Sequence, residues 1–373
     1  MKWLLLKIGL LLSSISFNNC FSGAGVGLGL DRRLFLINGG IIGVNNYLSY
    51  IKNSNALIIG CDKIGTEFAK NLRKSHLNII GTTTKPTKIN KLKEIVDDVV
   101  LIPQMEIGRD EVFREVVYDC PVIVIADIIS IFSVHTFVRT CMRIVKALEN
   151  KRKPTVVCLI SSVNVYGAHT DGAIVNEDAP IVNQPLPYAD DSNYWKINHL
   201  SNSKAIRLGE SYLFELAKIN PYIKPVVLRA SAIWNKEVMA KQLLFNEGRN
   251  YPRWVGNSYM SLSFTDEIAN AGVWAIDNYN RYGDNIYNIA SSSFKRNYFY
   301  NRLMKLGNKR PISWTDDKND DNDNDNYYSL DENPLLPNAM RYNLRVDCSK
   351  IINDNYKYLH KDLWKKLKLD LIN

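Results

Sequence analysis

The stretch IIGCDKIGTEF, residues 58–68, joins the end of an apolar run to the start of a helical pattern. A buried strand that leads through glycines into a helix, in the pattern G-x-G-x-x-G, begins a βαβ unit. Gly60 and Gly65 hold the first and third glycine positions, whereas Asp62 holds the second. The first glycine permits the tight turn, and the third lets helix and strand approach closely. The stretch therefore predicts a strand–turn–helix unit whose middle position departs from the pattern.

Downstream of this unit, short apolar runs alternate with helical patterns, which is typical of a parallel sheet with helices on both faces. The first strand is expected at residues 56–60. Further strands are expected at 77–81, 98–103, 121–127, 155–162, 224–230 and 285–291. Helices are expected at 65–75, 135–149, 202–218, 265–279 and 295–307. No internal repeat is present, and one large α/β domain with a small appendage accounts for the length.

The N-terminal segment predicts a secretory signal peptide over residues 1–24, because Lys2 precedes an apolar run and small residues follow it. A buried first helix or a membrane anchor is the alternative. Residues 25–54 contain one acid and many glycines and are expected to be an unstructured leader. A signal followed by such a leader resembles the bipartite targeting segment of proteins sent to a plastid bounded by several membranes. We therefore expect entry into the secretory pathway, with a plastid-type organelle as a further destination.

The charge is distributed unevenly along the chain. The net charge is +9, but the segment from Thr315 to Glu332 holds eight acids against Lys318, so the remainder carries +16. Residues 311–335 are too polar to pack and are expected to be a disordered insertion. A body this basic favours anionic partners such as phosphorylated cofactors, nucleic acid or acidic membrane, although a solvated lysine-rich surface explains it equally well. No stripe of aromatics alternating with Lys or Arg marks a nucleic-acid face.

The six cysteines contain no C-x-x-C pair and have no metal-like spacing with the five histidines. We therefore expect no metal site and no disulfide framework.

Four later segments together resemble the extended short-chain dehydrogenase/reductase superfamily, which contains sugar-nucleotide epimerases and dehydratases. They occur in the family's order over residues 56 to about 310: CLISSVNVYGAHTDGAIVNEDAP (158–180), VVLRASAIW (226–234), MSLSFTDEIANAGVWAI (260–276) and NIYNIASSSFKRN (285–297). GTTT at 81–84 resembles the G-T-T that often ends the second strand in the atypical branch of the superfamily. The resemblance implies an α/β fold, a Rossmann-type doubly wound parallel sheet with a small C-terminal substrate-domain appendage. It assigns residues 55–310 to the NAD(P)-binding domain and residues 336–373 to a helical tail of the same fold.

The resemblance also implies a nicotinamide cofactor, whose pyrophosphate lies at the helix N-terminus. Asp62 places a carboxylate where the phosphates are expected, which weakens this prediction. An acid after the second strand would bind the ribose hydroxyl, but GTTTKPTK (81–88) has none, so NADP(H) is favoured over NAD(H), with no cofactor as the alternative. The predicted cofactor-binding residues are Gly60, Asp62, Gly65, Thr82, Thr83, Lys85 and Ser161.

Enzymes of this superfamily use a tyrosine as acid/base, a lysine four residues later and a serine on the fifth strand. Ser162 holds the serine position, and Tyr166 follows it in V-Y-G. If Lys204 is the lysine, Leu200 holds the tyrosine position. If Glu210 is instead the glutamate that follows the lysine by four, the two positions fall at Asn202 and Ile206. Neither register supplies a tyrosine.

The predicted catalytic residues are Ser162, Tyr166 and Lys204, and Tyr188, Tyr194 and His199 are substitute proton donors. The sequence therefore supports an NADP(H)-binding, atypical reductase or epimerase-like enzyme that acts on a small metabolite. The alternative is a non-catalytic scaffold or an RNA-binding or assembly protein that retains the fold.

Overall fold

The structure is a computed structural model. It describes residues 35–37, 40–42, 55–75, 78–102, 110–126, 134–167, 169–181, 194–282, 285–315 and 342–372. The chain divides into two units, Met1–Ile41 and Ile42–Asn373. The predicted signal peptide lies outside the described residues.

Two short strands, β1 (Phe35–Ile37) and β2 (Gly40–Ile42), form a sheet of their own within the predicted leader. The expectation of an unstructured segment is therefore wrong at these positions. The physical reason is local, because Asn38-Gly39 is a turn-forming pair between two apolar runs, which favours strand pairing.

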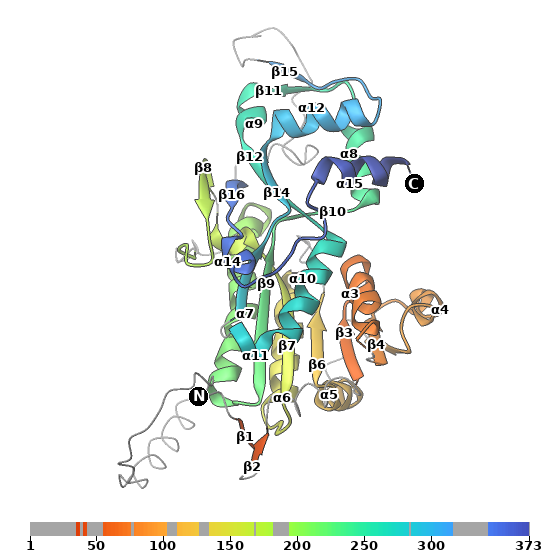
Figure 1. Ribbon diagram of the computed structural model, residues 1–373, viewed down its shortest axis with the longest axis vertical. Coiled ribbons are helices and arrows are strands. Elements are labelled where there is room, and N and C mark those ends of the chain that lie inside the picture. Colours follow the sequence, from red (N-terminus) through yellow and green to blue (C-terminus); the bar gives the residue numbers. More distant parts are fainter. Residues whose placement is uncertain are drawn as a thin grey trace, which may run out of the picture. The chain divides into compact units, whose positions relative to one another are not determined.

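The larger unit is built on one parallel sheet of seven strands in the order β13-β9-β7-β6-β3-β4-β5 (Figure 1). Every neighbouring pair in it is parallel. Its strands are β3 (Asn55–Ile59), β4 (Asn78–Thr83), β5 (Asp98–Leu101), β6 (Val122–Ile125), β7 (Thr155–Ser162), β9 (Ile223–Ala230) and β13 (Asn285–Ile289). The order reverses direction beside β3, so the predicted Rossmann-type doubly wound sheet is confirmed.

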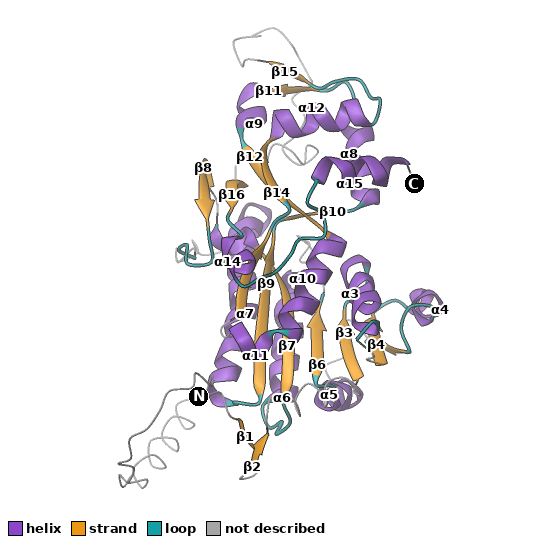
Figure 2. Ribbon diagram, viewed as in Figure 1, coloured by secondary structure: helices purple, strands orange, loops and turns teal. Residues whose placement is uncertain are grey.

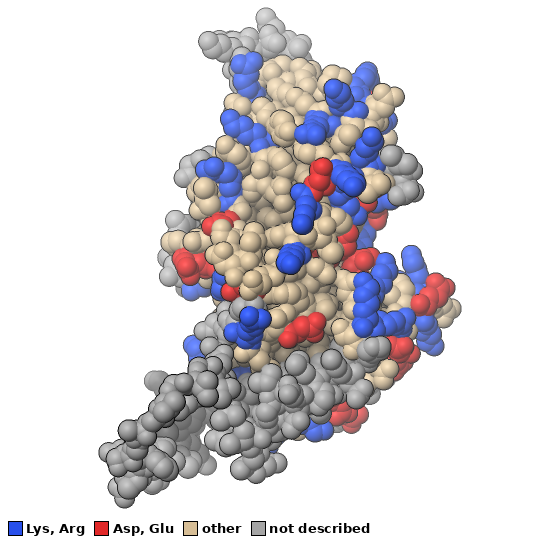
Figure 3. All heavy atoms as spheres, in the orientation of Figure 1, with Lys and Arg blue, Asp and Glu red and all other residues tan. Residues whose placement is uncertain are grey.

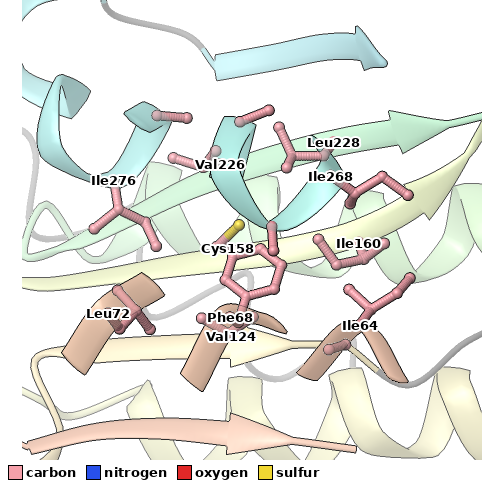
Figure 4. Packing of buried hydrophobic residues seen from close by; sticks show 14 of the residues in the cluster. Ile64, Phe68, Leu72, Val124, Cys158, Ile160, Val226, Leu228, Ile268 and Ile276 are labelled. Carbon is pink, nitrogen blue, oxygen red and sulfur yellow. The ribbon is translucent and has the colours of Figure 1, made fainter. Parts of the chain in front are cut away.

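Helices cover both faces of this sheet, and the covering follows from the alternation of side chains along each strand. Ile58 faces a core shared with Phe68 and Ile268, whereas Leu57 and Ile59 face the opposite core. Figure 4 shows the first core, where Phe68 of one helix packs among strand and helix side chains. That face carries α3 (Lys63–Arg73) and α10 (Thr265–Asp277), and the other carries α5 (Asp110–Asp119), α6 (Val134–Leu148) and α7 (Tyr194–Ile219).

Short elements complete this unit. They are the 3-10 turns η1 (Pro86–Lys88) and η2 (Val163–Tyr166) and the helices α4 (Ile89–Lys93), α11 (Tyr279–Tyr282) and α14 (Ser349–Asn353). Helix α5 was not expected from the sequence. Figure 2 shows how the helices and strands alternate along the chain through this part of the fold.

A separate hydrophobic core forms the predicted appendage, which we call the lobe. Its side chains come from segments far apart in the sequence, including Trp234, Phe299 and Leu367. The lobe contains β10 (Ala232–Trp234), α8 (Lys236–Asn246), β11 (Asn250–Pro252), α9 (Arg253–Asn257), β12 (Tyr259–Phe264), β14 (Ser292–Lys295), α12 (Arg296–Leu306), β15 (Ser313–Thr315) and α15 (Leu363–Ile372). Strands β10, β12 and β14 form one small sheet, and β11 pairs with β15.

Two predicted boundaries change. Strand β15 lies inside the predicted insertion 311–335, because Ile312 and Trp314 are apolar enough to pack into the lobe. Residues 316–341, which contain the acidic run, lie outside the described residues. The predicted helical tail includes a strand, β16 (Tyr342–Val346), which pairs in parallel with β8 (His169–Val175). No helix among the described residues is long and apolar enough to cross a membrane.

Candidate functional site

The first βα turn lies at the carboxyl end of β3, in the centre of the sheet. Gly60 has φ +79°, a conformation that favours glycine, and its amide donates to Thr82 Oγ1 at 3.1 Å. The Asp62 amide donates to the Gly60 carbonyl at 2.7 Å, which tightens the turn before helix α3 begins. A Cβ on Gly65 would lie 2.5 Å from the Gly60 carbonyl oxygen. Gly60 therefore permits the tight turn, and Gly65 lets helix α3 approach this turn closely, as the sequence pattern predicts.

The side chain of Asp62 makes no hydrogen bond to the amides that begin helix α3. Asp62 is the N-cap of α3, yet its carboxylate makes no capping hydrogen bond. Its Oδ1 instead accepts a hydrogen bond from Lys88 Nζ, in an ion pair at the surface. The carboxylate is thus bonded to a lysine of the neighbouring turn, and the expectation that it points toward the phosphate position stays a prediction. The first turn of α3 carries no acidic side chain and no side-chain cap.

The second βα turn lies beside the first, at the carboxyl end of β4. Thr82 is buried, and its hydroxyl is occupied by the Gly60 amide. Thr83 is also buried, and its Oγ1 accepts from the Lys85 amide at 3.2 Å. Both threonines therefore fix the backbone of the turn. Lys85 is exposed and forms no ion pair with any described carboxylate.

A second surface ion pair joins this region to the lobe. Lys63, the first residue of α3, lies 2.5 Å from the carboxylate of Glu237 on α8. Glu237 also pairs with Lys241 at 3.1 Å. Hydrogen bonds from Lys63 and then Lys241 lower the pKa of Glu237 to about 2, so the carboxylate is ionised at neutral pH. The sequence analysis missed this pair, since no local pattern links residues so far apart.

A buried polar network lies below the carboxyl ends of β7 and β9. Glu210 of α7 accepts from Arg229 Nη2 at 2.8 Å and from Arg229 Nε at 3.1 Å, and Ser161 Oγ lies 2.5 Å from the same carboxylate. Arg229 Nη1 donates to the Tyr166 hydroxyl at 3.0 Å, and that hydroxyl donates to Asn288 Oδ1 at 2.7 Å. These five side chains are all buried. The predicted site residues Ser161 and Tyr166 are therefore part of one internal network.

Electrostatics hold the network in its charged form. Burial alone would lower the pKa of Arg229, but the hydrogen bonds and charge of Glu210 raise it. Burial raises the pKa of Tyr166, and the nearby Arg229 opposes this only in part. Because its hydroxyl is buried and bonded on both sides, Tyr166 stabilises the network, and its catalytic role stays a prediction.

Ser162 differs from its neighbour Ser161. It is partly exposed, and its Oγ accepts from the Asn164 amide at 3.2 Å, where it caps η2. Its hydroxyl hydrogen has no acceptor among the described residues, so it retains a donor that a ligand oxygen can use. The catalytic role expected of Ser162 stays a prediction.

The structure describes the remaining candidate catalytic residues only in part. Lys204, Tyr194 and His199 lie in helix α7, and their side chains are not described. Tyr188 lies outside the described residues altogether. Among the described residues no group of His, Cys, Asp and Glu is arranged to hold a metal ion. Cys61, in the first turn, is buried, and burial raises its pKa to about 11, so it is a neutral thiol.

Comparisons with known proteins agree with this geometry at the level of the fold. No family model and no curated protein matches the chain. Among solved structures, the UDP-glucose 4-epimerase of Thermotoga maritima, with UDP-glucose, is similar at a TM-score of 0.61 and 15% identity, over 85% of this chain and 97% of that one. The UDP-glucuronic acid 4-epimerase of Bacillus cereus, in complex with UDP-glucuronic acid and NAD, gives 0.61 and 16%, over 85% and 98%.

The dTDP-glucose 4,6-dehydratase of Bacillus anthracis, in complex with NAD, also gives 0.61 and 16% identity, over 86% of this chain and 96% of that one. The chain therefore shares the fold of these two epimerases and of this dehydratase. The predicted resemblance to the epimerases and dehydratases is confirmed in fold.

Proposed function

We propose that the chain binds a dinucleotide of the NADP(H) type at the first βα turn and acts as an atypical reductase or epimerase-like enzyme on a small metabolite. The observation that carries the proposal is the first turn of α3, whose amides have no acidic side chain and no side-chain cap. Such amides bind a pyrophosphate readily. The structural neighbours in complex with NAD support a nicotinamide cofactor.

The preference for NADP(H) rests on the second turn. No acid follows β4 to accept a ribose hydroxyl, and Lys85 forms no ion pair among the described residues. A lysine ammonium in this place suits the 2′-phosphate of NADP(H) better than a free ribose hydroxyl. Lys88 would contribute only after exchanging its bond to Asp62 for one to the phosphate.

The reaction would proceed without the usual tyrosine and lysine. The bidentate contact between Glu210 and Arg229 supports the register that is anchored on Glu210. In that register Ile206, which is fully buried, holds the lysine position, and Asn202 holds the tyrosine position. Bound cofactor would supply hydride transfer, and Ser162 would orient the substrate oxygen. The proton would come from a group other than Tyr166.

A non-catalytic scaffold is the second candidate. Two observations favour it, namely the enclosure of Tyr166 in the internal network and the isoleucine at the lysine position. A scaffold with an intact turn would still bind the dinucleotide, but it would not turn over substrate. For either candidate, we propose that the N-terminal segment directs the chain into the secretory pathway.

Titration of the protein with NADPH and with NADH, followed by nucleotide fluorescence, tests the proposal. We expect NADPH to bind about tenfold more tightly than NADH, which corresponds to about 1.4 kcal/mol from the 2′-phosphate. Lys85→Ala should remove most of that difference, whereas the matched control Lys91→Ala, on exposed helix α4, should not. Equal affinity for both cofactors would contradict the NADP(H) preference. Absence of binding at millimolar concentrations would reject the cofactor site.

A further inference from the structure

The lobe carries far more positive charge than the rest of the chain. Its segments 232–258, 292–315 and 357–372 contain fifteen Lys and Arg against four Asp and Glu, a net charge of +11. Residues 292–315 contain no acid at all. In Figure 3 the upper part of the molecule, where Figure 1 places α8, α12 and α15, shows blue Lys and Arg groups with little red between them. A surface of this kind attracts polyanions.

The four acids of these segments are already partnered. Glu237 and Glu247 pair with lysines. Asp370 pairs with Lys366, and Asp362 accepts the amides of Trp364 and Lys365 at the start of α15. These four acids therefore do not neutralise the remaining Lys and Arg side chains of the lobe. Among the described carboxylates, none forms an ion pair with Lys305, Lys365 or Lys368.

An aromatic and cationic cluster lies in the middle of this face. Tyr298 and Arg302 are one turn apart on α12, and Arg302 Nη1 donates to the Tyr298 hydroxyl at 2.9 Å. Arg302 also lies over the ring of Trp364 of α15, with its Cζ 4.2 Å from the ring centroid. The rings of Tyr298 and Trp364 meet edge to face at 6.0 Å. The cluster thus joins the two helices.

The cluster is open to solvent at its outer edge. Tyr298 is 52% exposed, so part of its ring is open to solvent. Lys305 continues the exposed row of Tyr298 and Arg302 along α12. Lys365 and Lys368 form an exposed row on α15, beside Trp364. Each helix therefore presents lysines next to an aromatic ring.

We propose that this α12–α15 face binds single-stranded nucleic acid. The exposed lysines of the two helices can bind successive phosphates of a nucleic-acid backbone. The exposed ring of Tyr298, which is hydrogen-bonded by Arg302, offers a surface on which an unpaired base can stack. A duplex would use the lysines but not the ring, because its bases are stacked on one another. An anionic membrane would use both the lysines and the ring, so binding to vesicles is a separate outcome of the test below. This proposal does not depend on the cofactor proposal above.

Fluorescence anisotropy of a labelled single-stranded oligonucleotide of about 15 nucleotides, with the full chain at several salt concentrations, tests the proposal. Tyr298→Ala should weaken binding about fivefold or more and leave the salt dependence unchanged, because it removes the stacking ring but no charge. Tyr298→Phe should bind like the wild type. The double variant Lys365→Gln/Lys368→Gln should lower the slope of log affinity against log salt by about 1.4, at about 0.7 for each phosphate contact.

The matched control is Lys146→Gln/Lys153→Gln, which removes the same charge from exposed positions on α6 and before β7. It should leave the affinity nearly unchanged. Equal loss in the control, no effect of Tyr298→Ala, or equal affinity for duplex would overturn the proposal. So would binding to phosphatidylserine vesicles without binding to the oligonucleotide. Binding that appears only after the aspartates within residues 316–325 are changed to asparagine would also overturn it. In that case the chain's own acidic segment would be what binds the α12–α15 face.

Discussion

In the first βα turn the charged groups are paired at the surface, whereas in the network between α7, β7 and β9 they are paired in the interior. Asp62 and Lys88 are 65% and 38% exposed, while Glu210 and Arg229 are 4% and 1% exposed. A surface pair costs little to open, and a ligand phosphate can replace the carboxylate. A buried pair cannot be opened cheaply, because each charge would lose its oppositely charged partner in the interior. The turn is therefore suited to binding, and the network to holding the sheet and α7 together.

The largest expected effect is on the network. Arg229→Met leaves the Glu210 carboxylate buried without its partner, so we expect the free energy of unfolding to fall by about 3–5 kcal/mol. Chemical denaturation measures this. The matched surface variant, Lys63→Met, removes one of the two lysine partners of Glu237 and should lower the free energy of unfolding far less. If Arg229→Met and Lys63→Met lowered the free energy of unfolding by similar amounts, the buried and the surface ion pairs would not differ in their contribution to stability.

A smaller loss is expected when the packing of the turn is changed. Gly65→Ala places a Cβ 2.5 Å from the Gly60 carbonyl oxygen, so helix α3 must shift away from β3. We expect a loss of about 1–3 kcal/mol, together with weaker NADPH binding. Lys70→Ala on the exposed side of the same helix is the control for both measurements. A Gly65→Ala protein with wild-type stability would show that the close approach is not required.

Tyr166→Phe tests whether the hydroxyl is structural. Loss of its hydrogen bonds to Asn288 and from Arg229 should cost about 1–2 kcal/mol. Burial raises the pKa of Tyr166 above its ordinary value near 10, so this stabilisation is full below about pH 10 and is lost as the pH rises through the folded-state pKa. The difference in unfolding free energy between wild type and variant should therefore shrink above pH 10. NADPH binding should be unchanged at neutral pH, and a loss of binding there would instead place the hydroxyl in the site.

The smallest effect on stability is expected at Asp62. Asp62→Asn breaks an exposed ion pair and should change the free energy of unfolding by less than about 1 kcal/mol. It also frees Lys88 and removes a negative charge near the phosphates, so NADPH should bind up to about fivefold more tightly at low salt. The gain should shrink as salt rises, because exposed charges are screened. An equal gain at all salt concentrations would assign the effect to steric room.

The fold was largely predictable, because each sheet strand is a short apolar run. The four later segments also follow one another in the order of the family that they resemble. The lobe was not, because Trp234, Phe299 and Leu367 come together only through tertiary packing. In the site, Gly60 and Gly65 were predictable from their backbone roles. The direction of Asp62 was not, since it depends on Lys88, which is 26 residues away. The exposed cluster of Tyr298, Arg302 and Trp364 likewise spans two helices and leaves no linear pattern.

The central claim is that the first βα turn binds the dinucleotide and the network does not. Hydrogen–deuterium exchange of the protein with and without saturating NADPH tests it directly. We expect slower exchange of the backbone amides of residues 61–66 when NADPH is present, with no change across residues 158–166. Unchanged exchange in the turn, with protection confined to the network or to the lobe, would contradict it.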